Sequence, residues 1–286
     1  MLRENLAIAF QQLKSGKLRS MLTLLGITIG IATVISIVSV LEGYFANITR
    51  DLNVLGANTF QIEKNERIAG INMGPDKKKY RPNIKKELAA EIREKCRLVA
   101  LVGAEEWQGG QRIIYRDKHT NPNIQVAGGE PEFFPNNGYF IGRGRAITRQ
   151  DNINNRRVVV LGMDAVDVLF PFEEPIGKTV KIAGTRFKVI GLIEEMGSQS
   201  FGGSKDNIVV IPLTTFEDVY GRERSANITV SVREGVDYQQ AVDEVIGVTR
   251  RFRKVGPGEE NNFSIFSNDM LVSTFDQIAG SIQLAA

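Results

Sequence analysis

The chain has 286 residues, of which 42% are hydrophobic and 24% charged, and its formal net charge is +3. This length leaves room for one or two domains of ordinary size, and so small a net charge gives no reason to expect nucleic-acid binding. The single cysteine, Cys96, cannot form an intrachain disulfide, which excludes a disulfide-dense secreted module.

The first twenty residues predict a short amphipathic helix. Apolar side chains recur there at spacings of four, four and three, which places them on one helical face: Leu2, Leu6, Phe10 and Leu13. We expect residues 1–20 to lie along the cytoplasmic surface of a membrane.

Residues 21–42 are predicted to cross the membrane. The run of residues 21–41 contains no charge and no proline, and a helix of that length spans roughly 30 Å, the hydrocarbon thickness of a bilayer. A core helix of a soluble domain would carry charges on its far face. A signal peptide would have a shorter apolar region followed by a small-residue cleavage site, which the sequence after Leu41 does not offer.

Two features of this segment suggest how it is used. Gly26 and Gly30 form a G-x-x-x-G pair, a pattern that lets a second membrane helix approach closely and that also occurs by chance. The basic residues before the segment outnumber the acids, so the positive-inside bias predicts a cytoplasmic amino terminus. The topology determinants are Arg3, Lys14, Lys17 and Arg19.

Beyond the membrane segment we expect an α+β extracytoplasmic domain at residues 43–268. The helix is expected to continue outward to about Leu55. The later elements follow the order strand, helix, strands, strand, helix, strand, which is a split βαβ arrangement. Residues 43–127 and 225–268 are predicted to form this part, and residues 128–224 a mostly β insertion.

Two helices of the domain have recognisable starts. Asn83 is expected to cap a helix at residues 84–95, with Cys96 packed inward as an unreactive thiol. Asp237 is expected to open a helix that runs to Phe252. The last residues, 269–286, are predicted to begin a second membrane helix that continues past the end of the sequence.

Two strings imitate nucleotide-binding motifs. Residues 177–179 (GKT) resemble the end of a phosphate-binding loop, but Phe172 stands where the first glycine is required. Residues 107–111 (WQGGQ) resemble the signature of transporter ATPases without its preceding Leu-Ser. We predict no catalytic, cofactor-binding or metal-binding residue, and therefore a protein that is not itself an enzyme.

The whole chain resembles the permease subunits of bacterial ABC transporters of the MacB/FtsX-like class. The opening helix carries Glu4 and Ala7, and the strings that match are residues 16–27 (GKLRSMLTLLGI), 55–58 (LGAN), 126–131 (VAGGEP), 160–162 (VLG), 176–178 (IGK) and 207–212 (NIVVIP). The resemblance implies a first membrane helix, a MacB-like periplasmic core domain and further helices beyond this sequence.

The resemblance also implies partners and a location. It implies a separate ABC ATPase subunit on the cytoplasmic side, a second permease subunit in a homodimer or heterodimer, a periplasmic adaptor, and contact with membrane lipid in the bacterial inner membrane. The function it implies is export or mechanotransmission driven by ATP. The alternatives are a membrane-anchored signalling or scaffold protein whose outer domain recruits or senses an envelope partner, and an anchored enzyme, for which no polar site is visible.

Overall fold

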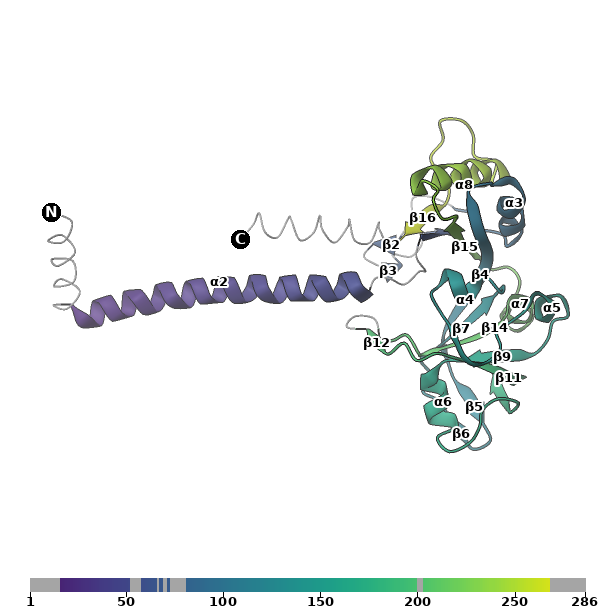
Figure 1. The fold of residues 1–286 in the computed structure, drawn as a ribbon, viewed down its shortest axis with the longest axis horizontal. Helices are drawn as coiled ribbons and strands as arrows, with labels where there is room; N and C mark the ends of the chain where they lie inside the picture. Colours follow the sequence, from purple (N-terminus) through teal and green to yellow (C-terminus); the bar gives the residue numbers. More distant parts are fainter. Residues whose placement is uncertain are drawn as a thin grey trace. The chain divides into compact units, whose positions relative to one another are not determined.

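The computed structural model of the protein describes residues 16–51, 58–65, 67–68, 71–72, 81–199 and 203–267. The chain divides into two compact units, Met1–Arg50 and Asp51–Ala286, which are treated separately below (Figure 1). Most of the expected amphipathic helix and the expected second membrane helix at residues 269–286 lie outside the described residues.

Helix α2 (Lys17–Asp51) is one unbroken helix of 35 residues. No proline interrupts it, and its segment Lys17–Ile37 is long and apolar enough to cross a membrane. At 1.5 Å per residue, the helix is about 52 Å long, well beyond the roughly 30 Å of a hydrocarbon layer. The expected outward continuation of the helix is therefore observed as far as Asp51, and residues 52–57 are not described.

The second unit is built on a 12-stranded sheet whose first four strands, in spatial order, are β16, β1, β15 and β4. All three pairings among them are antiparallel. Together with the helices between them, they give the expected split βαβ order. We call this part lobe 1, and its strands are β1 (Thr59–Glu63), the first half of β4 (Val99–Gln111), β15 (Asn227–Val232) and β16 (Ser264–Ser267).

Two helices complete lobe 1, α3 (Glu87–Lys95) and α8 (Tyr238–Phe252), and both bury an apolar face in one core with the strands. Asp237 caps α8 as expected, because its side chain accepts a hydrogen bond from the Gln240 amide. Cys96 is buried, and burial, followed by the charge of Glu244, raises the pKa of its thiol to about 11, as suits a packed and unreactive cysteine.

The expected Asn83 cap is wrong. Helix α3 begins three residues later, after Lys86, without a side-chain cap. The reason is that the backbone of Ile84 is engaged elsewhere: its N–H donates to Ser225 Oγ and its carbonyl accepts from the Ala226 amide. The Asn83 side chain instead donates to the Glu223 carbonyl.

The remaining strands of the large sheet form lobe 2, which also contains the second half of β4. Two pairings in this lobe are parallel, β14 with β7 and β11 with β9. The strands are β5 (Ile113–Tyr115), β6 (Lys118–His119), β7 (Ile124–Gly129), β8 (Ile141–Gly144), β9 (Val158–Leu161), β10 (Thr179–Ile182), β11 (Thr185–Ile193) and β14 (Ile208–Pro212).

Four short helices lie beside these strands: α4 (Phe133–Asn136), α5 (Arg149–Ile153), α6 (Met163–Leu169) and α7 (Leu213–Tyr220). Two small antiparallel pairs stand apart from the large sheet, β2 (Arg67–Ile68) with β3 (Ile71–Asn72) and β12 (Ser198–Gln199) with β13 (Gly203–Ser204).

The lobes meet along strand β4. Its first half pairs with β15 and its second half with β7, with Glu105 in both pairings. Strands β5 and β7, which both begin before residue 128, pack in one hydrophobic core with Val159 and Ile182 of lobe 2. The chain therefore enters the core of lobe 2 before residue 128. The domain division at residues 128 and 224 stays a prediction.

Two glycines of β7 allow helices to approach the sheet closely. A Cβ at Gly128 would lie 2.4 Å from Cβ and Cγ of Phe216 on α7, and one at Gly129 would lie 2.8 Å from Cβ of Phe133 on α4. Phe216 and Phe133 are almost fully buried. The packing leaves no room for a side chain at either position, which accounts for the two glycines of the VAGGEP string.

We expect Gly128→Ala to lower the free energy of unfolding of the full chain by about 1–3 kcal/mol, because the added methyl group must displace Phe216 in a close-packed core. Gly247→Ala is the matched control: it lies in α8, where nothing is within 4 Å of a Cβ, and should raise stability by about 0.5–1 kcal/mol. Thermal unfolding in detergent measures both. A Gly128→Ala protein as stable as the control would contradict the packing.

Candidate functional site

Helix α2 presents apolar side chains to its surroundings along its membrane-length segment. Leu25 is 53% exposed and Leu18 is 76% exposed, and the other large apolar side chains of the segment lie between these values. The polar side chains bond within the helix: the hydroxyls of Thr23, Thr28 and Thr33 donate to the carbonyls four residues earlier at 2.7–2.8 Å. A helix whose hydroxyls are satisfied internally is suited to hydrocarbon.

Gly26 and Gly30 leave an open strip on this helix, since no atom lies within 4 Å of a Cβ at either position. Lys17 and Arg19 are exposed in the first turn of α2. Arg3 and Lys14 lie outside the described residues. Roles for these six residues in helix packing and topology remain predictions.

A second candidate region is the junction of the lobes on β4, where Glu105 is 1% exposed. Its Oε1 accepts hydrogen bonds from Gln61 Nε2 on β1 at 2.5 Å and from the Trp107 indole at 2.9 Å. Its Oε2 accepts from Asn137 Nδ2, just after α4, at 2.6 Å. One carboxylate thus joins side chains of both lobes, and hydrogen bonds to a charged group are stronger than those between neutral groups.

Further contacts join the lobes near Glu105. Asn136 Nδ2 donates to the carbonyl and hydroxyl oxygens of Thr229 on β15. Arg93 of α3 forms an ion pair with Glu130, which follows β7, at 3.0 Å. These contacts, added to the shared strand, make the two lobes one connected body.

We expect Glu105→Gln to lower the free energy of unfolding by about 1–3 kcal/mol, because the amide replaces one acceptor with a donor that faces another donor in a buried site. Glu234→Gln, at an exposed position, is the matched control and should change stability little. Denaturant unfolding followed by circular dichroism measures the two. Equal stability of both variants would show that the Glu105 network does not hold the lobes together.

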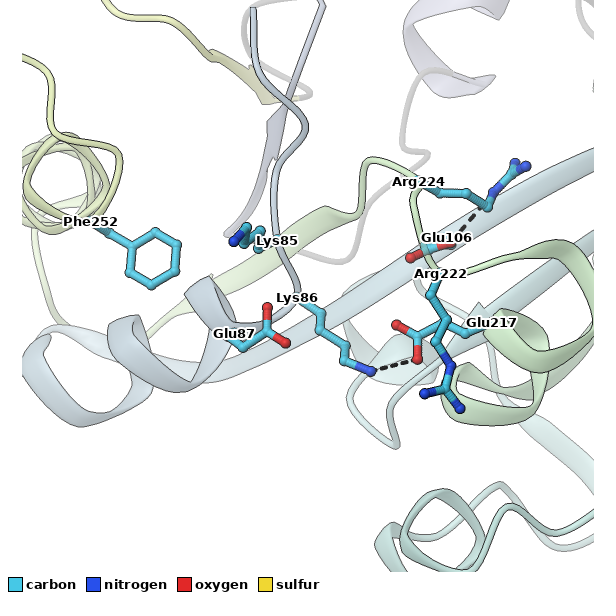
Figure 2. A pocket seen from close by; sticks show the side chains of 8 residues that line it. All are labelled: Lys85, Lys86, Glu87, Glu106, Glu217, Arg222, Arg224 and Phe252. Carbon is cyan, nitrogen blue, oxygen red and sulfur yellow. Dashed lines mark hydrogen bonds and ion pairs between the residues drawn. The ribbon is translucent and has the colours of Figure 1, made fainter.

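The opposite face of β4 borders a cavity of about 530 Å³ between the lobes (Figure 2). Glu106 lines it with a side chain only 4% exposed, and Arg224 Nε lies 3.5 Å from its Oε2. Across the cavity, Lys86, the residue just before α3, forms an ion pair with Glu217 of α7 at 2.5 Å. Burial and then the charge of Glu217 raise the pKa of Glu106 to about 7, against the lowering effect of Arg224 and Lys86.

Sequence reasoning missed both glutamates. The signal was present, because two adjacent acids follow directly on the uncharged residues 98–104. The two nucleotide-like strings do not line this cavity. Gly177 lies in a turn before β10 with a φ of +86°, and Trp107 is part of β4. Within the described ranges, no group of three His, Cys, Asp or Glu side chains is placed to hold a metal ion.

Comparison with known proteins gives one family and several relatives. The family described as the MacB-like periplasmic core domain matches residues 20–248. The chain is 26% identical to the macrolide export ATP-binding/permease protein MacB of Marinobacter nauticus, over 98% of this chain and 42% of that protein. It is 30% identical to MacB of Chlorobium luteolum, over 86% of this chain and 37% of that protein.

Two solved structures share the fold of the second unit. The periplasmic region of MacB from Actinobacillus actinomycetemcomitans matches with a TM-score of 0.64 at 21% identity, covering 80% of this chain and 97% of that one. The extracellular domain of the transporter YknZ from Gram-positive bacteria matches with a TM-score of 0.56 at 16% identity, over 73% of this chain and 100% of that one. The chain spans about two fifths of the length of the MacB relatives.

Proposed function

Because the chain belongs to the MacB-like periplasmic core domain family, we propose that it forms the first membrane helix and the outer domain of an ABC transporter permease subunit. In this role it couples ATP hydrolysis inside the cell to movement of the outer domain, as an exporter or a mechanotransmitter. The observation that carries the proposal is α2, which runs without a break from its apolar segment to Asp51. A rigid helix transmits displacement, whereas a flexible linker would absorb it.

The proposal includes an orientation in the bacterial inner membrane. Lys17 and Arg19 start the apolar segment, and together with Arg3 and Lys14 they favour a cytoplasmic amino terminus by the positive-inside bias. The domain from residue 51 onward then lies outside the cytoplasmic membrane. The family's own description as periplasmic supports this side.

The proposal also includes partners. The MacB relatives are named as ATP-binding/permease proteins, whereas Phe172 replaces the first glycine that a phosphate-binding loop in this chain would need. In keeping with what the resemblance to the MacB/FtsX-like class implies, we assign ATP hydrolysis to a separate subunit and transport to a dimer of permeases. A periplasmic adaptor is a further candidate partner. The competing function is a membrane-anchored scaffold or sensor, which would work without any ATPase.

We expect replacement of Gly26 and Gly30 together by Leu to reduce dimer formation and ATP-driven transport at least tenfold, because two bulky side chains would keep a neighbouring helix away. The matched control is Thr28→Leu with Ala32→Leu, which adds bulk to the opposite face of α2. Crosslinking in membranes and transport in vesicles measure the effect. If both double variants behaved alike, close packing through the glycine face would be ruled out.

The orientation can be tested with a thiol reagent that does not cross membranes. In a Cys96→Ser background, a cysteine placed at the exposed Lys118 should react in intact cells, and a cysteine at position 12 should react only after the cells are opened. The reverse pattern would invert the topology and remove the basis for a cytoplasmic ATPase partner.

A further inference from the structure

The cavity between the lobes is richer in basic than in acidic side chains. Figure 2 shows four basic residues around it, Lys85, Lys86, Arg222 and Arg224, against three acids. Two ion pairs lie at the cavity. Lys86 pairs with Glu217 across it, and Arg224 pairs with Glu106 along its wall. Arg222 bonds to Asp218 on α7 with 71% of its own side chain exposed.

Lys85 is the fourth of the basic residues that line the cavity. It is exposed, and no ion pair joins it to any residue in the part of the chain that the structure describes. Lys85 lines the same cavity as Lys86, Arg222 and Arg224, and like charges around one cavity repel one another unless an anion lies among them. The cavity thus has positive charge available for a ligand.

Glu106 gives a second, independent sign of a ligand. It is buried and lines the cavity, and its Oε2 has no hydrogen-bond partner among the described residues, with Arg224 Nε at 3.5 Å. Because burial and the charge of Glu217 raise its pKa to about 7, the carboxyl group can be protonated near neutral pH. In that state it removes a negative charge from the cavity and supplies an O–H donor.

The cavity extends over an aromatic ring. A second cavity of about 220 Å³ shares Lys85 and Phe252 with the first and is also lined by Pro82 and Arg253. Arg253 is engaged, since it donates to the carbonyls of Pro82, Asn83 and Asn262. A ligand that filled both cavities would pass from a basic region on to the face of Phe252.

We propose that this interlobe cavity binds an organic anion with an apolar portion, whose carboxylate or phosphate group lies among Lys85, Lys86 and Arg222 and whose apolar portion packs on Phe252. The bound oxygen accepts a hydrogen bond from protonated Glu106. This site goes beyond the proposed transport function and does not depend on it, because all of its residues lie in the outer domain.

The test uses the full chain in lipid nanodiscs, with octanoate and octyl phosphate as probes and octylammonium and octanol as matched controls. Isothermal titration calorimetry measures binding. We expect saturable binding of the anions and none of the controls. The tighter of the two anions identifies the headgroup. Equal binding of octanol would overturn anion recognition.

Variants locate the site. Lys85→Ala with Arg222→Ala should weaken anion binding at least tenfold, and neither single substitution removes a buried partner. Lys118→Ala with Lys181→Ala removes two exposed cations from lobe 2 outside the cavity and should leave binding unchanged. Unaltered binding by the first pair, or equal losses in both pairs, would overturn the assignment to this cavity.

The dependence on pH tests Glu106, which faces Lys86 just before α3, Glu217 from α7 and Arg224 from the segment before β15. Octanoate binding should weaken about tenfold between pH 6 and pH 8, as the Glu106 proton is lost. In Glu106→Gln, binding should persist and this decline should disappear. A decline that is identical in the variant would overturn the role of Glu106.

Discussion

The second unit depends on one shared strand. Strand β4 has 13 residues and would span about 43 Å when extended. It pairs with β15 over its first half and with β7 over its second. The two lobes therefore belong to one continuous sheet through this strand. Glu105, at the point where the partner changes, adds side-chain bonds to both lobes.

The neighbouring glutamates have different surroundings because a strand alternates its side chains between two faces. Glu105 lies on the face where amide and indole donors converge, so its carboxylate is well satisfied. Glu106 lies on the other face, beside Glu217 and a cavity, and its Oε2 has no hydrogen-bond partner within the described part of the chain. One strand therefore joins the lobes with one face and lines a cavity with the other.

The sequence was most informative where a local rule sufficed. The length of α2, the Asp237 cap and the split βαβ order follow from runs, caps and alternation, and all three are observed. Gly103 of β4 is explained only by tertiary packing, since a Cβ there would lie 2.9 Å from Cβ of Glu132.

The cavity could not be predicted from local patterns. Lys86 and Glu217, which form its ion pair, are 131 positions apart, and no spacing rule connects them. The Asn83 cap failed for a related reason, because Ile84 bonds to Ser225 and Ala226, which lie far along the chain. Contacts of this kind are set by how the lobes meet, and only the folded chain reveals them.

The length of α2 has a mechanical consequence. A straight rod of about 52 Å that tilts by about 10° about one end displaces its other end by about 9 Å. The same helix cut at the membrane boundary, at about 30 Å, would move its tip by only about 5 Å. Because α2 extends past its apolar segment to Asp51, a given tilt of the whole helix displaces its carboxyl end further than it would displace the end of a helix cut to membrane length.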